Sequence, residues 1–276
     1  MRRMAEENNI SSSQNARVSK LIDEMTLFDD DLMTLVFNQN IPAVELLLRI
    51  VLGRKVNVKE HSVQVEFRNP ISDGRNITLD VVAVDENGVE IDIEVQGNST
   101  GAHVRRARFH SAALDYRMLK KNEEFNKLRD SYVIFIYKHD KFGKGLPIYK
   151  ASRFVEETGE PLEDGSHIIY VNGTYKGNDE IGRLMHDFNS LTSEGMNYKE
   201  LAEGIHHFKE TEEGRDTMCE SVKNYAQEYA EEYAADSKVE MVKNLMKNMK
   251  LTLEQALNAT GITGKERAII TKQLQK

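Results

Sequence analysis

Acidic side chains alternate with hydrophobic ones over residues 89–96, which read VEIDIEVQ. The even positions hold Glu90, Asp92, Glu94 and Gln96, and every odd position is β-branched. Because successive side chains of a strand point to opposite faces, this alternation predicts a strand with one acidic face. Such a face is either solvated or suited to a hard divalent cation, which prefers carboxylate oxygens.

The preceding segment, ITLDVVAVD over residues 77–85, alternates in the same way, and Asn-Gly follows it closely. This pattern predicts a β-hairpin. A three-residue loop ending at a left-handed Gly88 would set Asp80 directly opposite Glu94. A two-residue Asn-Gly turn would set Asp80 opposite Val95 and mix the polar and apolar faces. The apolar pattern therefore favours the three-residue loop.

Asp80 and Glu94 would then have Cβ atoms roughly 5 Å apart. Carboxylates at this separation repel each other unless one is protonated or a cation lies between them. Mg²⁺ is the expected cation, with Mn²⁺ or Ca²⁺ as alternatives. The alternation alone leaves open whether this pair binds metal or faces water. We expect Glu90 and Asp92 to face water.

Helix and strand patterns surround the hairpin. Asn40 and Pro42 begin a predicted helix that ends at Gly53, and a second helical pattern covers residues 103–121. The segment SYVIFIYK is a buried strand by its continuous apolar run. The order of elements predicts an α/β fold with a central mixed β-sheet flanked by helices and a helical C-terminal region.

The chain divides by composition into four expected parts. These are a polar, disordered tail over 1–18, a core over 19–195, an acidic helical segment over 196–240 and a small basic helical segment over 241–276. Residues 200–240 carry twelve acidic and four basic residues, whereas 241–276 carry seven basic and two acidic ones. These opposite charges predict a homo-oligomer through the C-terminal helices, or equally a pairing within one chain.

The overall composition limits the class of protein. A net charge of −8 argues against a histone-like binder, although residues 103–129 hold eight basic and three acidic residues. Cys219 is the only cysteine, which excludes an internal disulfide and a cysteine metal cluster. We find no apolar run of membrane-spanning length and no secretory signal pattern, and we expect a cytoplasmic protein with no membrane partner.

The pattern of Asp80 and Glu94-Val95-Gln96, followed by a basic helix, resembles the active site of the PD-(D/E)XK nuclease superfamily. It is most similar to the recombination-promoting nuclease or putative transposase family, where the final lysine is commonly glutamine. The similarity extends over roughly residues 20–210. The similar segments are LFDDDLMTLVFNQNIPAVELLLRIVLG, ITLDVVAVDENGVEIDIEVQ, RRARFHSAALDY, SYVIFIYKHDKFGKGLPIY and SHIIYVNGTYKG.

The resemblance implies a restriction-endonuclease-like core that cleaves DNA phosphodiester bonds as a Mg²⁺-dependent endonuclease in recombination or mobile elements. Asp80 and Glu94 match the acidic metal ligands, and the Val95 carbonyl matches the backbone ligand. Glu45, on the helix before the sheet, matches an acidic ligand found in some members. Gln96 stands in place of the lysine of the motif.

This glutamine changes the expected chemistry, because an amide can orient the attacking water but cannot take up its proton in a useful pH range. The basic helix would bind DNA phosphates through Arg105, Arg106 and Arg108. We expect His103 to have no catalytic role, and the same holds for His110.

Two other functions fit the same residues. The chain could be an inactive or weak nuclease fold that serves as a nucleic-acid- or protein-binding module. It could also be a metal-dependent phosphohydrolase acting on RNA or nucleotides. Retention of Asp80, Glu94 and Gln96 together favours the endonuclease.

Overall fold

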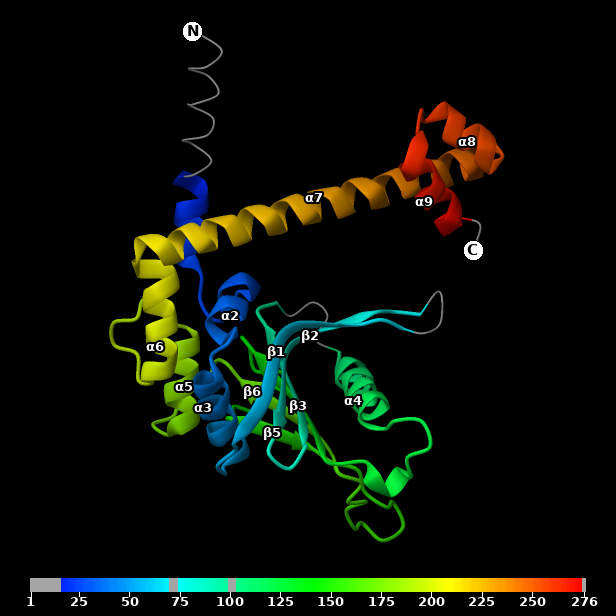
Figure 1. Ribbon diagram of the computed structural model, residues 1–276. Helices are drawn as coiled ribbons and strands as arrows, with labels where there is room; N and C mark the ends of the chain where they lie inside the picture. Colours follow the sequence, from blue (N-terminus) through cyan, green and yellow to red (C-terminus); the bar gives the residue numbers. More distant parts are fainter. Residues whose placement is uncertain (1–15, 70–73, 99–102, 275–276) are drawn as a thin grey trace. The chain divides into compact units, whose positions relative to one another are not determined.

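The computed structural model describes residues 16–69, 74–98 and 103–274, which fall into two compact units, residues 1–219 and 220–276. Most of the tail expected over 1–18 lies outside the described residues, and residues 16–24 are helical. The expected α/β fold with a mixed sheet flanked by helices is confirmed in the first unit (Figure 1).

The sheet has six strands in the order β1-β2-β3-β4-β6-β5. The first three strands pair antiparallel, β3–β4 and β4–β6 pair parallel, and β5 lies antiparallel at the edge. β3 is therefore an inner strand with a neighbour on each side. The strands are β1 (Val58–Phe67), β2 (Ile77–Asp85), β3 (Glu90–Gln96), β4 (Ser131–Tyr137), β5 (Ile148–Ala151) and β6 (Ser166–Asn172).

Helices cover the two faces of the sheet (Figure 1). α4 (Val104–Met118) packs on β3, β4 and β6, whereas α2 (Asp30–Phe37) and α3 (Ile41–Leu52) contact β1 from the other side. The core beneath α4 combines apolar side chains of the sheet and the helix, including Val82, Leu114, Val133 and Phe135. The remaining helices of this unit are η1 (Phe125–Lys127), α5 (Glu180–Phe188), α6 (Lys199–Ile205), η2 (His206–Glu210) and the start of α7 (Glu212–Met249).

The helix signals of the sequence act as expected in α3. The Asn40 side chain accepts a hydrogen bond from the Ala43 N–H, and the helix ends at Gly53 with φ +69°. No single helix in the described part of the chain is long and apolar enough to span a membrane. α2 and α3 together have the length and apolar composition of a membrane span, but the two helices meet at a bend of 107°.

The β2–β3 hairpin has the predicted register. Val82 pairs with Asp92, the Asp85 N–H donates to the Val89 carbonyl, and Gly88 has φ +77°. These are the features of the three-residue loop. The Asp85 carboxylate stabilises this loop, because its Oδ1 accepts hydrogen bonds from the Asn87 and Val89 N–H groups at 2.8 and 2.9 Å.

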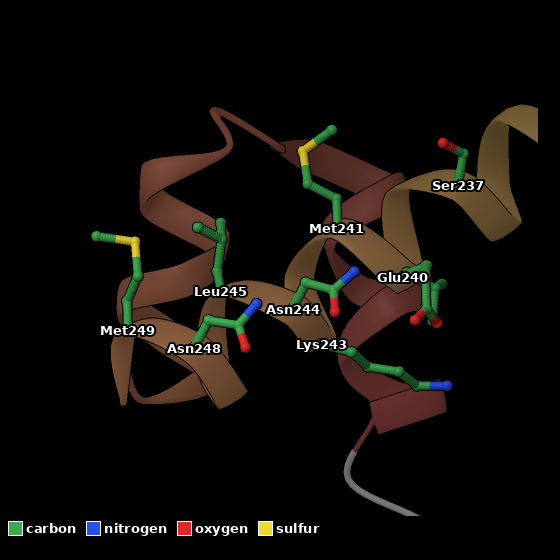
Figure 2. A pocket seen from close by; sticks show the side chains of 9 residues that line it. Ser237, Glu240, Met241, Lys243, Asn244, Leu245, Asn248 and Met249 are labelled. Atoms are coloured by element: carbon green, nitrogen blue, oxygen red, sulfur yellow. The ribbon is translucent and has the colours of Figure 1, made fainter.

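The second unit contains the end of α7 with α8 (Leu253–Ala259) and α9 (Gly264–Leu274). Its small core includes Val242, Leu257 and Ile270, and a capping box at Thr252 begins α8. A hollow of about 970 Å³ follows one side of α7, where two methionines lie among polar side chains (Figure 2). Glu240 is the one acidic residue among those that line this hollow, so the hollow has no cluster of carboxylates that could bind a metal. Self-association through these helices stays a prediction.

We expect Asp85→Ala to lower the free energy of unfolding by about 1–3 kcal/mol, because two loop N–H groups lose a buried acceptor. Asp85→Asn is the matched control, since its side-chain oxygen can accept both bonds. Urea denaturation measures both variants. Equal losses for alanine and asparagine would show that these hydrogen bonds do not stabilise the hairpin.

Candidate active site

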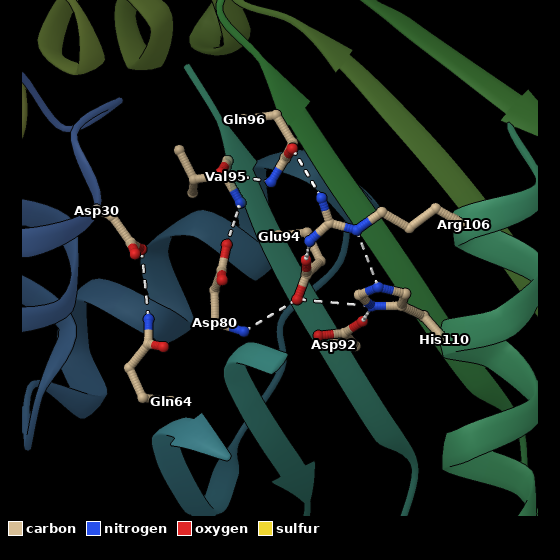
Figure 3. Close-up of polar contacts among 9 residues, drawn as sticks. All are labelled: Asp30, Gln64, Asp80, Asp92, Glu94, Val95, Gln96, Arg106 and His110. Carbon is tan, nitrogen blue, oxygen red and sulfur yellow. Dashed lines mark hydrogen bonds and ion pairs between the residues drawn. The ribbon is translucent and has the colours of Figure 1, made fainter. Parts of the chain in front are cut away.

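Three carboxylates from adjacent inner strands lie close together (Figure 3). Those of Asp92 and Glu94 contact side chains of α4, whereas that of Asp80 lies on the side of Asp30. Asp80 is 9% exposed, and Asp92 and Glu94 are fully buried. The Asp80 N–H donates to Glu94 Oε1 at 2.9 Å, and the Val95 N–H donates to Asp80 Oδ2 at 2.8 Å. Each carboxylate thus accepts an N–H from the opposite strand, which keeps the pair together as the hairpin register predicted.

Arg106 of α4 provides the cation of this cluster. Its Nη2 lies 2.7 Å from Glu94 Oε2, and its Nη1 donates to Gln96 Oε1 at 2.8 Å. Its Nε donates to His110 Nε2 at 3.2 Å. The side chain is 33% exposed, so the guanidinium lies between the buried carboxylates and solvent.

The expectation that Asp92 faces water is wrong. β3 has a strand on each side, and α4 covers the face to which Asp92 points, so the acidic face of VEIDIEVQ lies inside the protein. Asp92 Oδ2 lies 2.8 Å from His110 Nδ1, which gives this carboxylate its polar partner. Glu90 is also largely buried, with its side chain 12% exposed and 3.5 Å from Arg117.

His110, for which we expected no catalytic role, is likewise part of the cluster. The ring is 1% exposed and contacts Asp92 and Arg106 through its two nitrogens. One signal was available: residues 106 and 110 are spaced i,i+4, which places both on one face of α4. His103, in contrast, is the N-cap of α4 and accepts a hydrogen bond from the Arg105 N–H.

Burial dominates the electrostatics of the three carboxylates. Burial and the neighbouring Glu94 raise the pKa of Asp80 well above its ordinary value, and burial and Asp80 do the same to the pKa of Asp92. Burial and Asp92 raise the pKa of Glu94. Burial and the Arg106 charge lower the pKa of His110 to about 3, so the imidazole is neutral near pH 7.

This donor set fits a divalent cation. With His110 neutral, full ionisation of the three carboxylates would leave two negative charges that Arg106 does not compensate. Among the described residues, Asp92 Oδ1 is a buried oxygen with no hydrogen-bond partner. Ligand atoms of Asp92, Glu94 and His110 lie within 4.8 Å of one another, close enough to hold one ion.

A cavity of about 420 Å³ opens beside the cluster, and it is also lined by Asp29 and Asp30, two carboxylates that the sequence did not assign to the site. Asp30, at the start of α2, lines it together with Asp80, Val95, Gln96 and Arg106. Burial and Asp31 raise the pKa of Asp30, which also accepts a hydrogen bond from Gln64 (Figure 3).

Glu45, predicted as a further metal ligand, is not among the residues that line this cavity. Its Oε1 accepts a hydrogen bond from the Val58 N–H at 2.8 Å, because α3 runs past the start of β1. Asp30, in contrast, lines the cavity together with Asp80, and its charge contributes to the raised pKa of Asp80. Arg105 and Arg108 lie exposed on α4.

A family model described as PD-(D/E)XK nuclease family transposase matches residues 39–176, which is half of the chain. The matched span includes α3, the six strands and α4, and with them Asp80, Glu94 and Gln96. Searches of curated proteins and of solved structures found no match.

The raised pKa of Asp92 predicts a pH-dependent stability. The folded protein holds a proton on this carboxyl more tightly than the unfolded chain, so its contribution to stability is complete below the ordinary pKa and is lost as pH rises. We therefore expect Asp92→Asn to gain stability relative to wild type as the pH rises above about 5 in metal-free buffer. Chemical denaturation at several pH values measures the difference.

Asp179→Asn is the control for this series. A hydrogen bond from the Gly182 N–H lowers the pKa of Asp179, so both its folded and unfolded pKa values lie below this window. Its stability difference from wild type should be flat over the same range. A flat difference for Asp92→Asn as well would contradict the burial of an ionisable carboxylate at this position.

Proposed function

From the premise that the chain belongs to the PD-(D/E)XK nuclease family transposases, we propose that it is a metal-dependent endonuclease that hydrolyses DNA phosphodiester bonds in recombination or mobile-element reactions. The single observation that carries the proposal is the group of buried carboxylates beside a cavity that also contains cationic side chains. Carboxylates hold a metal, and cations bind phosphate, so one site has both requirements of phosphodiester cleavage.

Asp80, Glu94 and the Val95 carbonyl would hold Mg²⁺, or alternatively Mn²⁺ or Ca²⁺, with Asp30 close by. When bound, such a cation makes water more acidic and neutralises charge on the phosphate. Asp80 is favoured over Asp92 because it lines the cavity. The buried group of Asp92, Glu94 and His110 is the alternative position, but the Arg106 guanidinium beside it repels a second cation.

Gln96 would orient the attacking water. Its Oε1 accepts from Arg106, and its Nε2 donates to the Val95 carbonyl at 3.1 Å, so both ends of the amide are held. The oxygen has a second lone pair with which to accept a hydrogen bond from water. The amide cannot remove the proton, which must pass to solvent or to a phosphate oxygen.

Arg106 would bind the scissile phosphate. A guanidinium has five N–H donors, and three of them contact Glu94, Gln96 and His110, which leaves two for phosphate oxygens. Lys138 lines the same cavity and supplies a second positive charge. Arg105 and Arg108, exposed on the same helix, would contact neighbouring phosphates of the DNA backbone.

A second function is favoured by one contact. The 2.7 Å pair between Arg106 and Glu94 already neutralises part of the carboxylate charge, which lowers the need for a metal. A chain that keeps this pair in the presence of Mg²⁺ would bind nucleic acid without cleaving it. This is the inactive or weak nuclease fold acting as a binding module.

Cleavage of supercoiled plasmid with Mg²⁺, Mn²⁺ or Ca²⁺ tests the proposal. We expect cleavage with Mg²⁺ or Mn²⁺, and a loss of about 100-fold or more in Asp80→Asn and in Glu94→Gln, since each removes a metal-binding charge. Glu45→Gln is the matched control and should keep its activity, because its amide oxygen can still accept from the Val58 N–H.

Three outcomes separate the alternatives. Cleavage that survives both Asp80→Asn and Glu94→Gln would place the activity elsewhere. DNA binding with no cleavage under any metal would favour the binding module. A loss of activity in Glu45→Gln equal to that in Asp80→Asn would restore Glu45 as a ligand.

Gln96→Lys restores the lysine of the motif, and we expect it to lower cleavage by about tenfold, not to raise it. The new ammonium would face the Arg106 guanidinium, which now donates to the glutamine oxygen at 2.8 Å. Gln96→Glu is the comparison, because it keeps an acceptor for Arg106. Initial cleavage rates at saturating Mg²⁺ measure both, and faster cleavage by Gln96→Lys would contradict the role given to this contact.

A further inference from the structure

His110 links Arg106 to Asp92 through two hydrogen bonds, and the chemistry of the side chains determines which atom donates in each. Arginine only donates, so His110 Nε2 must accept from the Arg106 Nε–H at 3.2 Å and carry no proton. The neutral ring then carries its proton on Nδ1, which donates to Asp92 Oδ2 at 2.8 Å. Asp92 thereby selects the tautomer of His110 that can hold the arginine.

The same contact limits how Arg106 can pair with Glu94. A guanidinium binds a carboxylate strongly when two parallel N–H groups, such as those of Nε and one terminal nitrogen, donate together. His110 occupies Nε, so Arg106 reaches Glu94 through Nη2 alone, and Glu94 Oε1 stays on the side of Asp80. The Phe135 ring completes the restraint, with its centroid 5.6 Å from the guanidinium carbon and 5.4 Å from the His110 ring.

We propose that Asp92 and His110 are positioning residues. They hold Arg106 so that it contacts Glu94 through Nη2 alone and its two remaining N–H donors face a DNA phosphate in the cavity. The proposal rests on the proposed function for the identity of the phosphate. Without the pair, the Arg106 Nε would be free to join Nη2 on Glu94, and the guanidinium would turn its remaining donors away from the cavity.

The test replaces both buried polar groups with apolar ones, as Asp92→Leu together with His110→Phe, so that neither is left unpaired. Fluorescence anisotropy with a labelled DNA duplex and Ca²⁺ in place of Mg²⁺ measures binding. We expect about tenfold weaker binding or more in this variant. In an Arg106→Gln background the same two substitutions should have no further effect, because they act through the arginine.

Ser111→Ala is the matched control. Ser111 is a neighbouring buried residue of α4 whose hydroxyl contacts Ser166 at 2.8 Å, so it samples the packing of the helix without contacting Arg106. DNA binding by Ser111→Ala should equal that of wild type. Equal weakening of binding by the apolar pair with and without Arg106 would overturn the positioning role, as would unchanged binding in the wild-type background.

The tautomer of His110 is a readout that does not depend on DNA. Nitrogen-15 chemical shifts should give a protonated Nδ1 and an unprotonated Nε2 in the wild-type protein. A protonated Nε2 would overturn the proposal. If the wild-type protein binds no DNA while the expected tautomer is present, the proposed function fails and the restraint on Arg106 stands.

Discussion

The burial of three carboxylates against one guanidinium is the constraint on which the site depends. Asp80, Asp92 and Glu94 lie on two adjacent inner strands, at a depth where an ionised carboxylate is stable only if it is paired. Arg106 offsets one charge, and burial raises the pKa of each carboxyl, which favours its protonated form when no cation is bound. A divalent cation can replace those protons, so an arrangement that is costly for folding becomes a binding site.

Two structural features bring these groups together. The three-residue loop at Gly88 sets the register of the hairpin, and that register places Asp80 beside Glu94. The i,i+4 spacing of Arg106 and His110 on α4 then delivers a cation and an imidazole to the same face. A one-residue shift of either strand would turn its acidic side chains to the opposite face and separate them.

The hairpin register could be predicted from the sequence, because turn residues and the alternation of side chains both act over a few residues. The sequence predicted the proximity of Asp80 and Glu94 for the same reason. It was insufficient for Asp92, because alternation does not tell whether the polar face of a strand meets water or a helix. The positions of Asp30 and Glu45 relative to the site could not be predicted for a related reason, since both lie on helices whose placement against the sheet depends on tertiary packing.

Metal binding with proton counting tests the central claim most directly. Calorimetric titration of Mn²⁺ near pH 6, in buffers of different ionisation enthalpy, measures both the affinity and the protons released. The account predicts binding at one site with release of protons, and loss of both signals in Asp80→Asn combined with Glu94→Gln. Binding that releases no proton, or that persists in this double variant, would contradict a metal held by the buried carboxylates.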